Sequence, residues 1–406
     1  MTTAIGVEPD CPFSPAALKK VVYAGSQSGS FVQATKDLAA LAELPVSRER
    51  VQRWTKRVGR ERSIEIEAAA VAYQELPLPE QRRSPHLQVP QVACVQMDGG
   101  RIQLRERRDA AKQAGSKGHW RETLIGCLLS MASEEHATDP CPTILETFVD
   151  RRRMADLSRE IKGFSAVGND DDAPPESDLE DRPGRPQVLV RSVVATRDGV
   201  ERFGARLVAA AHARGFHAAR QKAFVADGSA TNWGVHRKHF SHYTAILDFT
   251  HAICYVYAAA MTGRSAADGW EHYRRWAQWL WDGDTTALIT ALEARSDELG
   301  PPSTGDSEAC PSWVVAETLR YIQNQRTRME YARYRRLGLP ITSSHIESTI
   351  KQVNRRVKGT EKFWDRGAEP LLQLVGDHLS ETLDLHHFWS RRPHRLSPTR
   401  CYQTAA

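Results

Sequence analysis

The stretch that decides the fold, residues 92–100, reads VACVQMDGG. Five of its first six residues are apolar, which is typical of a strand buried on both faces, and Asp98 follows at once. The two glycines predict a tight turn, and the alternating RIQLRE of residues 101–106 predicts the second strand of a hairpin. We therefore expect Asp98 at the end of a buried strand, where its carboxylate is well placed to bind a metal ion.

The composition sets broad limits on the protein. Its 406 residues favour two or three domains, and its formal net charge of +5 permits a polyanionic partner without requiring one. The seven cysteines are scattered and form no Cys-x-x-Cys pair, which argues against a zinc knuckle and favours a reducing compartment. With neither a secretion signal nor an apolar run of about 18 residues, the sequence predicts a cytoplasmic protein without a membrane partner.

Two further apolar stretches also end in an acid. Residues 222–227 read KAFVAD and residues 243–248 read YTAILD. Predicted helices alternate with these strands, which favours βαβ units and a partly parallel sheet. Parallel strands bring their carboxyl ends to a common edge, so Asp98 and Asp227 are expected to approach each other there. Asp248 ends the last of these strands and begins a helix that carries His251.

A third candidate acid, Glu347, lies in the first turn of a predicted helix that begins near residue 342. Glu347 lies on a flanking face of this helix together with several basic residues. We interpret these bases as contacts for a phosphate backbone, although a solvated face is the plainer alternative. The candidate DNA-binding residues of this helix are Lys351, Arg355, Arg356 and Lys358.

The N-terminal part predicts two short helices joined by a tight turn. Ser30 is placed to cap the first helix and Ser47 the second, which runs over residues 48–58. Such a pair, with a strongly basic second helix, is typical of a helix-turn-helix that binds DNA. The alternative is a helical hairpin with a solvated basic face. The candidate DNA-binding residues are Arg48, Arg50, Arg53, Lys56 and Arg57.

The pattern along the chain predicts five regions. We expect an N-terminal helical DNA-binding domain over residues 1–80 and the first part of an α/β core over residues 88–261, with a disordered acidic loop near residues 166–186. An α-helical insertion rich in tryptophan is predicted over residues 262–338. The last part of the core, with the Glu347 helix, is expected over residues 339–390, followed by a tail over residues 391–406.

Three acids from distant parts of the chain suit one kind of chemistry. Mg²⁺ takes oxygen ligands, and two such ions about 4 Å apart can activate a water or a 3′-hydroxyl and stabilise the leaving oxygen in phosphodiester cleavage. Each acid also has a plainer interpretation. Asp98 and Asp227 precede glycine as turn residues do, and Ser344 and Glu347 have the spacing of a capping box.

Four segments in order resemble bacterial insertion-sequence transposases of the DDE type, in the ISKra-like group. They are VQMDGGR at residues 95–101, FVADGS at 224–229, LDFTH at 247–251 and SHIESTIKQVNRRVKG at 344–359. The resemblance extends from about residue 90 to 380, and the predicted helical insertion precedes the last segment. The acidic stretch near Asp170 departs from the pattern of that group.

The resemblance implies a ribonuclease-H-like mixed sheet, two divalent ions (Mg²⁺ or Mn²⁺), and cutting and joining of double-stranded DNA at element ends and target by a homo-oligomer. It also implies a nucleoid-associated protein. It places the catalytic and metal-binding acids at Asp98, Asp227 and Glu347. Asp248 and His251 match a further motif of related transposases. Asp248 is also an alternative to Asp227 as a ligand, and His251 is either a helix-start histidine bonded within the core or a residue beside the active site.

Two other functions remain open on the sequence. A structure-specific nuclease with the same core would cut DNA and never join it. A DNA-binding repressor with an inactive core would use the N-terminal helices alone, although the presence of all three acids argues against it.

Overall fold

The computed structural model describes residues 11–83, 85, 89–104, 120–163, 182–303, 305, 307–358, 363–364 and 367–395. Residues 105–119 and most of the predicted acidic loop, residues 164–181, lie outside this part of the chain. The fold is mixed α/β, with N-terminal helices followed by a mixed sheet and many further helices. No helix in the described part is long and apolar enough to cross a membrane.

The sheet has the strand order β3-β2-β1-β4-β5. Its strands are β1 (Val92–Leu104), β2 (Trp120–Ala132), β3 (Gln187–Thr196), β4 (Gln221–Ala226) and β5 (Thr244–Leu247), and the two-residue β6 (Phe363–Trp364) pairs with the far end of β1. β1 pairs with β2, and β2 with β3, in antiparallel fashion. The β1–β4 and β4–β5 pairs are parallel, which confirms the partly parallel sheet.

The predicted hairpin turn at Gly99 and Gly100 is wrong. β1 runs straight through both glycines and stays paired with β2 from Val92 opposite Met131 to Gln103 opposite Trp120. Gly100 meets a close neighbour instead, because a Cβ atom there would lie 2.9 Å from the Thr123 hydroxyl oxygen. A glycine inside a strand often marks such a close approach. Asp98 therefore lies within a long strand and not at its end.

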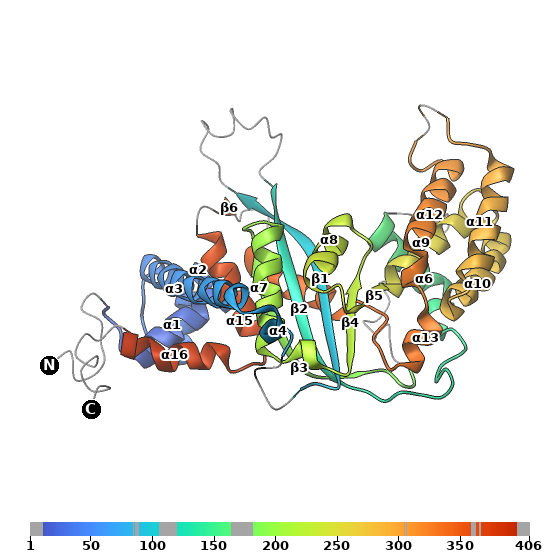
Figure 1. The fold of residues 1–406 in the computed structure, drawn as a ribbon. Helices are drawn as coiled ribbons and strands as arrows, with labels where there is room; N and C mark the ends of the chain where they lie inside the picture. The colour runs from blue at the N-terminus through green and yellow to red at the C-terminus, as the bar shows by residue number, and fades with distance from the viewer. Residues whose placement is uncertain are drawn as a thin grey trace.

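Helices cover both faces of the sheet (Figure 1). Gly126 of β2 faces Phe203 and Leu207 of α7 (Val200–Ala213), whereas the next residue, Cys127, lies 4.0 Å from the Thr349 hydroxyl of α14 (Ser344–Val357). Successive strand residues point to opposite faces, so α7 and α14 lie on opposite sides of the sheet. Beside α14, α15 (Ala368–Leu379) packs on β3.

The helices between residues 249 and 336 form the side of the molecule beyond β5 (Figure 1). α8 (Ala230–His239) follows β4, and α9 (Phe249–Met261) follows β5, as predicted. The segment predicted as a helical insertion, residues 262–338, is helical, with Trp276 buried in its core. It comprises α10 (Ala266–Asp282), α11 (Thr285–Leu299), α12 (Pro311–Gln325), η4 (Arg326–Arg328) and α13 (Tyr331–Arg336). Two short elements, η2 (Glu146–Phe148) and α6 (Arg151–Lys162), precede β3, and η3 (Phe216–Ala218) follows α7.

The N-terminal helices differ from the prediction in length and number. Besides α2 (Phe31–Ala42), there is an earlier helix, α1 (Pro15–Gln27), and α3 (Arg48–Glu75) continues far past residue 58 to the short α4 (Leu78–Gln81). Ser30 and Ser47 cap α2 and α3 as expected. Trp54 and its apolar neighbours on α3 are buried in a cluster that also contains Leu374 and Phe388, from α15 and α16 (Asp384–Arg395). The N-terminal helices therefore share a core with the end of the chain, and residues 391–395 belong to a helix and not to the predicted tail.

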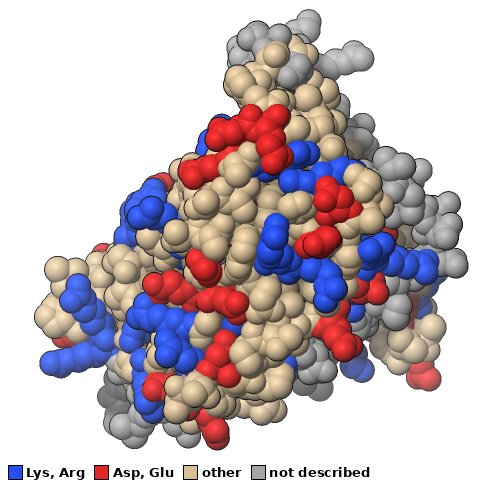
Figure 2. Space-filling view, turned by 90° about the vertical axis from the view of Figure 1, so that its right-hand side faces the viewer, with Lys and Arg blue, Asp and Glu red and all other residues tan. Residues whose placement is uncertain are grey.

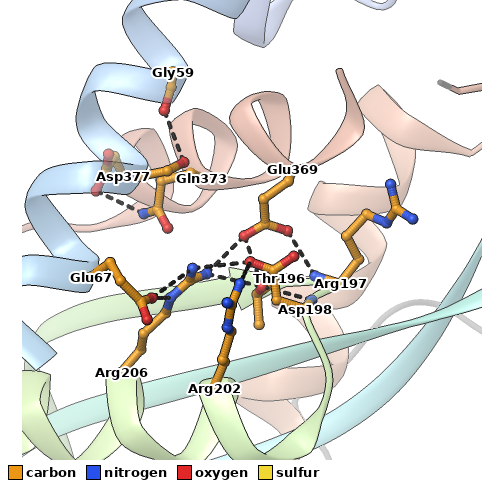
Figure 3. Close-up of polar contacts among 11 residues, drawn as sticks. Gly59, Glu67, Thr196, Arg197, Asp198, Arg202, Arg206, Glu369, Gln373 and Asp377 are labelled. Atoms are coloured by element: carbon orange, nitrogen blue, oxygen red, sulfur yellow. Dashed lines mark hydrogen bonds and ion pairs between the residues drawn. The ribbon is translucent and has the colours of Figure 1, made fainter. Parts of the chain in front are cut away.

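A buried arginine joins four elements where α3 meets the core (Figure 3). The Arg206 side chain, only 4% exposed, extends from α7. Its guanidinium lies 2.8 Å from Glu369 of α15, 3.0 Å from Glu67 of α3 and 3.0 Å from Asp198, and it donates to the Thr196 hydroxyl at the end of β3. This network ties the N-terminal helices to both faces of the sheet.

Candidate active site

Three acids stand in one row across the parallel strands. Gln96 of β1 is opposite Val225 of β4, so two residues further along Asp98 is level with Asp227. Ala226 of β4 is opposite Leu247 of β5, so Asp227 is level with Asp248. This edge of the sheet lies beneath the start of α8 and α9, as expected for residues at the carboxyl ends of parallel strands.

Asp98 is half-buried and lies close to other carboxylates. Burial, together with the neighbouring charges of Asp227 and Asp248, raises the pKa of its carboxyl to about 6, while the Gly99 N–H and His251 oppose this rise. The Gly99 N–H donates to the Asp98 Oδ1 atom at 2.6 Å. Because β1 continues past it, Asp98 is not a turn residue.

Asp227 is both a turn residue and a member of this row. Its Oδ1 atom accepts hydrogen bonds from the Ser229 N–H at 2.9 Å and from the Asn232 side-chain amide at 2.8 Å. Gly228 beside it has a φ of +100°, which favours glycine. The turn aims the carboxylate toward the site, because its charge acts on both Asp98 and His251.

Asp248 and His251 form a tight pair at the start of α9. The fully buried Asp248 caps the helix through the His251 N–H at 3.0 Å, and the same Oδ2 atom lies 2.5 Å from His251 Nδ1. Burial lowers the pKa of His251, but the hydrogen bond and charge of Asp248, with further contributions from Glu347 and Asp227, raise it to about 9. His251 is therefore an imidazolium at neutral pH that offsets the surrounding acids.

Glu347 enters the site from α14. Burial and the charge of Asp248 raise the pKa of its carboxyl to about 7, while His251 opposes this rise. The helix begins after Ser343, which makes no side-chain capping bond, so the capping box from Ser344 does not form. The Ser343 hydroxyl lies 3.5 Å from Glu347 Oε1, at the limit of a hydrogen bond. The structure therefore does not support Glu347 as the glutamate of a capping box with Ser344.

The tightest group of candidate metal ligands in the described part of the chain is Asp248, His251 and Glu347, whose ligand atoms lie within 4.8 Å of one another. Both Asp248 oxygens, however, already accept hydrogen bonds, since Oδ1 takes the Ser343 N–H at 2.8 Å. We therefore interpret Asp248 as the residue that fixes His251 and the start of α14. Asp98 and Asp227 lie outside this group. With Glu347 they offer carboxylate oxygens, the ligand type that Mg²⁺ prefers, so the chemistry of the donor set fits a hard divalent cation.

Residues that the sequence did not single out hold this geometry. Gln96, fully buried on β1, donates to the Thr342 carbonyl at 3.0 Å and accepts the Ile346 N–H at 3.1 Å. Tyr321 of α12 donates to the Asp227 carbonyl at 2.7 Å, so the insertion braces this turn. A buried polar residue in an apolar strand was the available signal for Gln96, but its partners lie some 250 positions away in the chain.

We expect the Gln96→Leu variant to lose about 1–3 kcal/mol of unfolding free energy, because two buried hydrogen bonds are lost, one to the Thr342 carbonyl and one from the Ile346 N–H, which keeps only the Ser343 carbonyl as acceptor. Urea denaturation measures this loss. The matched control is Gln352→Leu on α14, whose amide makes only an exposed bond with Ser348, and which should stay within about 0.5 kcal/mol of wild type. Equal stability of the two variants would show that Gln96 does not hold the start of α14.

The basic residues of α3 have different surroundings. Arg48, Arg50 and Arg53 are exposed, as a DNA-contacting surface requires. Lys56 and Arg57 are half-buried, and the Arg57 guanidinium stacks 4.8 Å above Trp54 and pairs with Glu61 at 3.6 Å. DNA binding by this helix stays a prediction.

Among the bases of α14, the prediction that Arg356 contacts DNA is wrong. It is 3% exposed, donates to the Gly25 carbonyl at 2.8 Å and stacks on Phe31, so its guanidinium joins α14 to the N-terminal helices and does not face DNA. Lys351, Arg355 and Lys358 are exposed, although Lys351 lies 3.3 Å from Glu160. Helical spacing alone did not show that Arg356 faces inward.

Comparisons with known proteins assign no family: no family model matches the sequence, and the search of curated proteins finds no match. A functional conclusion therefore depends on the geometry of the acids.

Proposed function

We propose that the chain is a DDE-type DNA transposase of the ISKra-like group, with a ribonuclease-H-like core that cleaves DNA ends and transfers strands. The observation that carries the proposal is the row of Asp98 and Asp227 on parallel strands, with Glu347 arriving from α14 beside the same Asp248–His251 pair. The mixed sheet order, with three antiparallel-linked strands before two parallel ones, supports the ribonuclease-H-like assignment.

Asp98, Asp227 and Glu347 are the residues that would hold two Mg²⁺ or Mn²⁺ ions. Such ions, when bound, activate the attacking water or 3′-hydroxyl and stabilise the leaving oxygen. The chain contributes the orientation of these acids. Asp248 keeps a proton on His251 Nδ1, and the resulting positive charge offsets the crowded carboxylates. Gln96 and Ser343 hold the first turn of α14, from which Glu347 extends.

Double-stranded DNA is the partner that this arrangement supports. Exposed bases on α14 follow Glu347, and Arg48, Arg50 and Arg53 are exposed on α3. The outer face of the helical insertion is a poorer candidate. Figure 2 shows acidic and basic side chains interspersed over the described residues of that face, which gives DNA no uniform charge to follow.

The test is nicking of a duplex that carries the element end, in the presence of Mg²⁺. We expect the Glu347→Gln and Asp227→Asn variants to bind this duplex as wild type does. Their nicking rate should fall by more than roughly 100-fold, because loss of a residue that only supports a metal ligand costs roughly 10–100-fold. Glu271→Gln, at an exposed position of α10, is the matched control and should nick normally. Full nicking by both site variants would end the proposal.

A structure-specific nuclease has the same acid geometry, so cleavage does not separate it from a transposase. A strand-transfer assay with pre-cut ends does. Joined products support the transposase, and cleavage without joining supports the nuclease.

A further inference from the structure

The helical insertion reaches the candidate active site through α12. The Tyr321 hydroxyl donates to the Asp227 backbone carbonyl at 2.7 Å, and the Gln325 side-chain amide donates to the Gly228 carbonyl at 3.2 Å. Tyr321 and Gln325 lie one turn apart on the same face of α12. Their two acceptors belong to the turn that directly follows β4. Two side chains of the insertion therefore hold the backbone of a residue whose carboxylate we assign to metal binding.

The Tyr321 ring is held between α9 and this turn. Tyr255 of α9 stacks on it, with 3.9 Å between the ring centroids and 2° between the ring planes. A Cβ atom at Gly228 would lie 2.9 Å from Tyr321 Cε2, so the ring lies close against the turn. Lys162 of α6 places its Nζ atom 3.6 Å from the centre of the Tyr255 ring and 2.8 Å from Glu317 of α12. These contacts fix the position of the Tyr321 hydroxyl.

The Tyr321 hydroxyl acts as a donor in this hydrogen bond. Burial, followed by the neighbouring Tyr255 and the charge of Asp227, raises the pKa of the phenol, so the group stays protonated. A backbone carbonyl can only accept, and the proton of the hydrogen bond therefore comes from Tyr321. A phenylalanine at this position would keep the ring and its stacking and would remove this proton donor alone.

The Asp227 carboxylate is held separately, through one of its two oxygens. Oδ1 accepts from the Ser229 N–H and from the Asn232 amide, and Asn232 also donates to the Met97 carbonyl at 3.4 Å, next to Asp98 on β1. Within the described part of the chain, both hydrogen bonds to this carboxylate go to Oδ1, which leaves Oδ2 to an ion. The direction of Oδ2 therefore depends on the Oδ1 contacts and on the backbone that Tyr321 holds.

We propose that Tyr321 is a positioning residue for the Asp227 carboxylate, through which the helical insertion sets the affinity of the site for divalent ions. This inference rests on the proposed function, because it takes Asp227 to be a metal ligand. Without the hydroxyl, the Asp227 carbonyl loses this donor, and the turn at Gly228 gains freedom to rotate. The carboxylate then spends less time in the orientation that binds an ion, so binding weakens.

Titration of the full-length chain with Mn²⁺, followed by electron paramagnetic resonance of the free ion, tests this inference. We expect Tyr321→Phe to bind Mn²⁺ roughly tenfold more weakly than wild type, at the lower end of the roughly 10–100-fold cost of losing a residue that supports a metal ligand. The matched control is Tyr273→Phe, on α10 of the same insertion. The buried Tyr273 hydroxyl donates to the Phe148 carbonyl of η2 and not to the Asp227 turn, so this variant should bind Mn²⁺ as wild type does.

A second readout separates positioning from a purely structural role. Nicking by Tyr321→Phe should recover when Mg²⁺ is raised about tenfold, because the ligands themselves are intact. Urea denaturation confirms that the variant is folded. Should it not fold, Gln325→Met, which removes the second donor to this turn, takes its place with weakening in the same direction.

Lower stability with unchanged Mn²⁺ affinity would show a purely structural role and overturn the inference, as would equal weakening by Tyr273→Phe. Absence of Mn²⁺ binding by wild type would overturn the proposed function, and this inference with it. Mn²⁺ binding by wild type together with an unchanged Tyr321→Phe would overturn this inference alone.

Discussion

The Asp98→Asn variant is expected to be more stable than wild type without divalent ions at pH 7–8, and to lose most of the stabilisation that Mg²⁺ gives to wild type. The Asp98 carboxyl has a pKa raised to about 6, first by burial and then by Asp227. A raised acid pKa means that the ionised form destabilises the folded chain. This penalty is absent below about pH 3.8, grows as pH rises toward 6, and is complete above it. An amide at this position avoids the penalty.

With Mg²⁺ bound, we expect wild type to be the more stable of the two proteins. A cation that binds only the folded chain stabilises it by about 2.7 kcal/mol at a concentration 100 times its dissociation constant. Wild type should gain this amount from Mg²⁺, and Asp98→Asn only a small part of it, because one carboxylate ligand is gone. Thermal unfolding with and without Mg²⁺ measures both effects. The control is Asp297→Asn, at an exposed position of α11, which should match wild type in both conditions. A destabilised Asp98→Asn chain with a normal Mg²⁺ response would contradict the assignment.

The second large effect is expected at Arg206. We predict that Arg206→Met loses about 3 kcal/mol of unfolding free energy, because Glu369, 14% exposed, loses its cationic partner and keeps only hydrogen bonds from the Thr196 hydroxyl and the Arg197 N–H. The value lies at the lower end of the range for broken buried pairs, since Glu67 and Asp198 keep more contact with water. Urea denaturation measures the loss.

Arg202 offers the matched control on the same helix. Its side chain is 63% exposed and lies 3.7 Å from Asp198 (Figure 3). Exposed pairs of this kind contribute about 0–1 kcal/mol, so Arg202→Met should be close to wild type. Arg206→Met and Arg202→Met of equal stability would show that the network at α3, α7 and α15 does not fasten the N-terminal helices.

The sequence predicted the elements whose signal is local. The apolar stretches that end in an acid located β4 and β5, and Asp227 and Asp248 follow these strands as expected. The capping residues Ser30 and Ser47 located the first turns of α2 and α3. β3 was not predicted, because its first residues alternate in exposure whereas its last five are all buried, so the strand shows no single period, and it follows an irregular region. α1 was not predicted, although Ser14 caps it and Pro15 begins it.

Non-local contacts decided the remainder. Gly99 and Gly100 have the sequence of a turn, but β1 continues through them because it stays paired with β2. At Gly100 the Thr123 hydroxyl of β2 leaves no room for a side chain. Arg356 belongs to a basic helix, yet Gly25 and Phe31 from the other end of the chain enclose it. Periodicity on one helix does not reveal which of its flanking faces another segment will cover.

The central claim is that Asp98, Asp227 and Glu347 bind the same divalent ions. Anomalous diffraction from crystals of the protein grown with Mn²⁺ tests it most directly. The account predicts anomalous peaks within coordination distance of carboxylate oxygens from all three residues. Peaks held by Asp248 and His251 without Asp98 and Asp227, or no peak at this edge of the sheet, would contradict it.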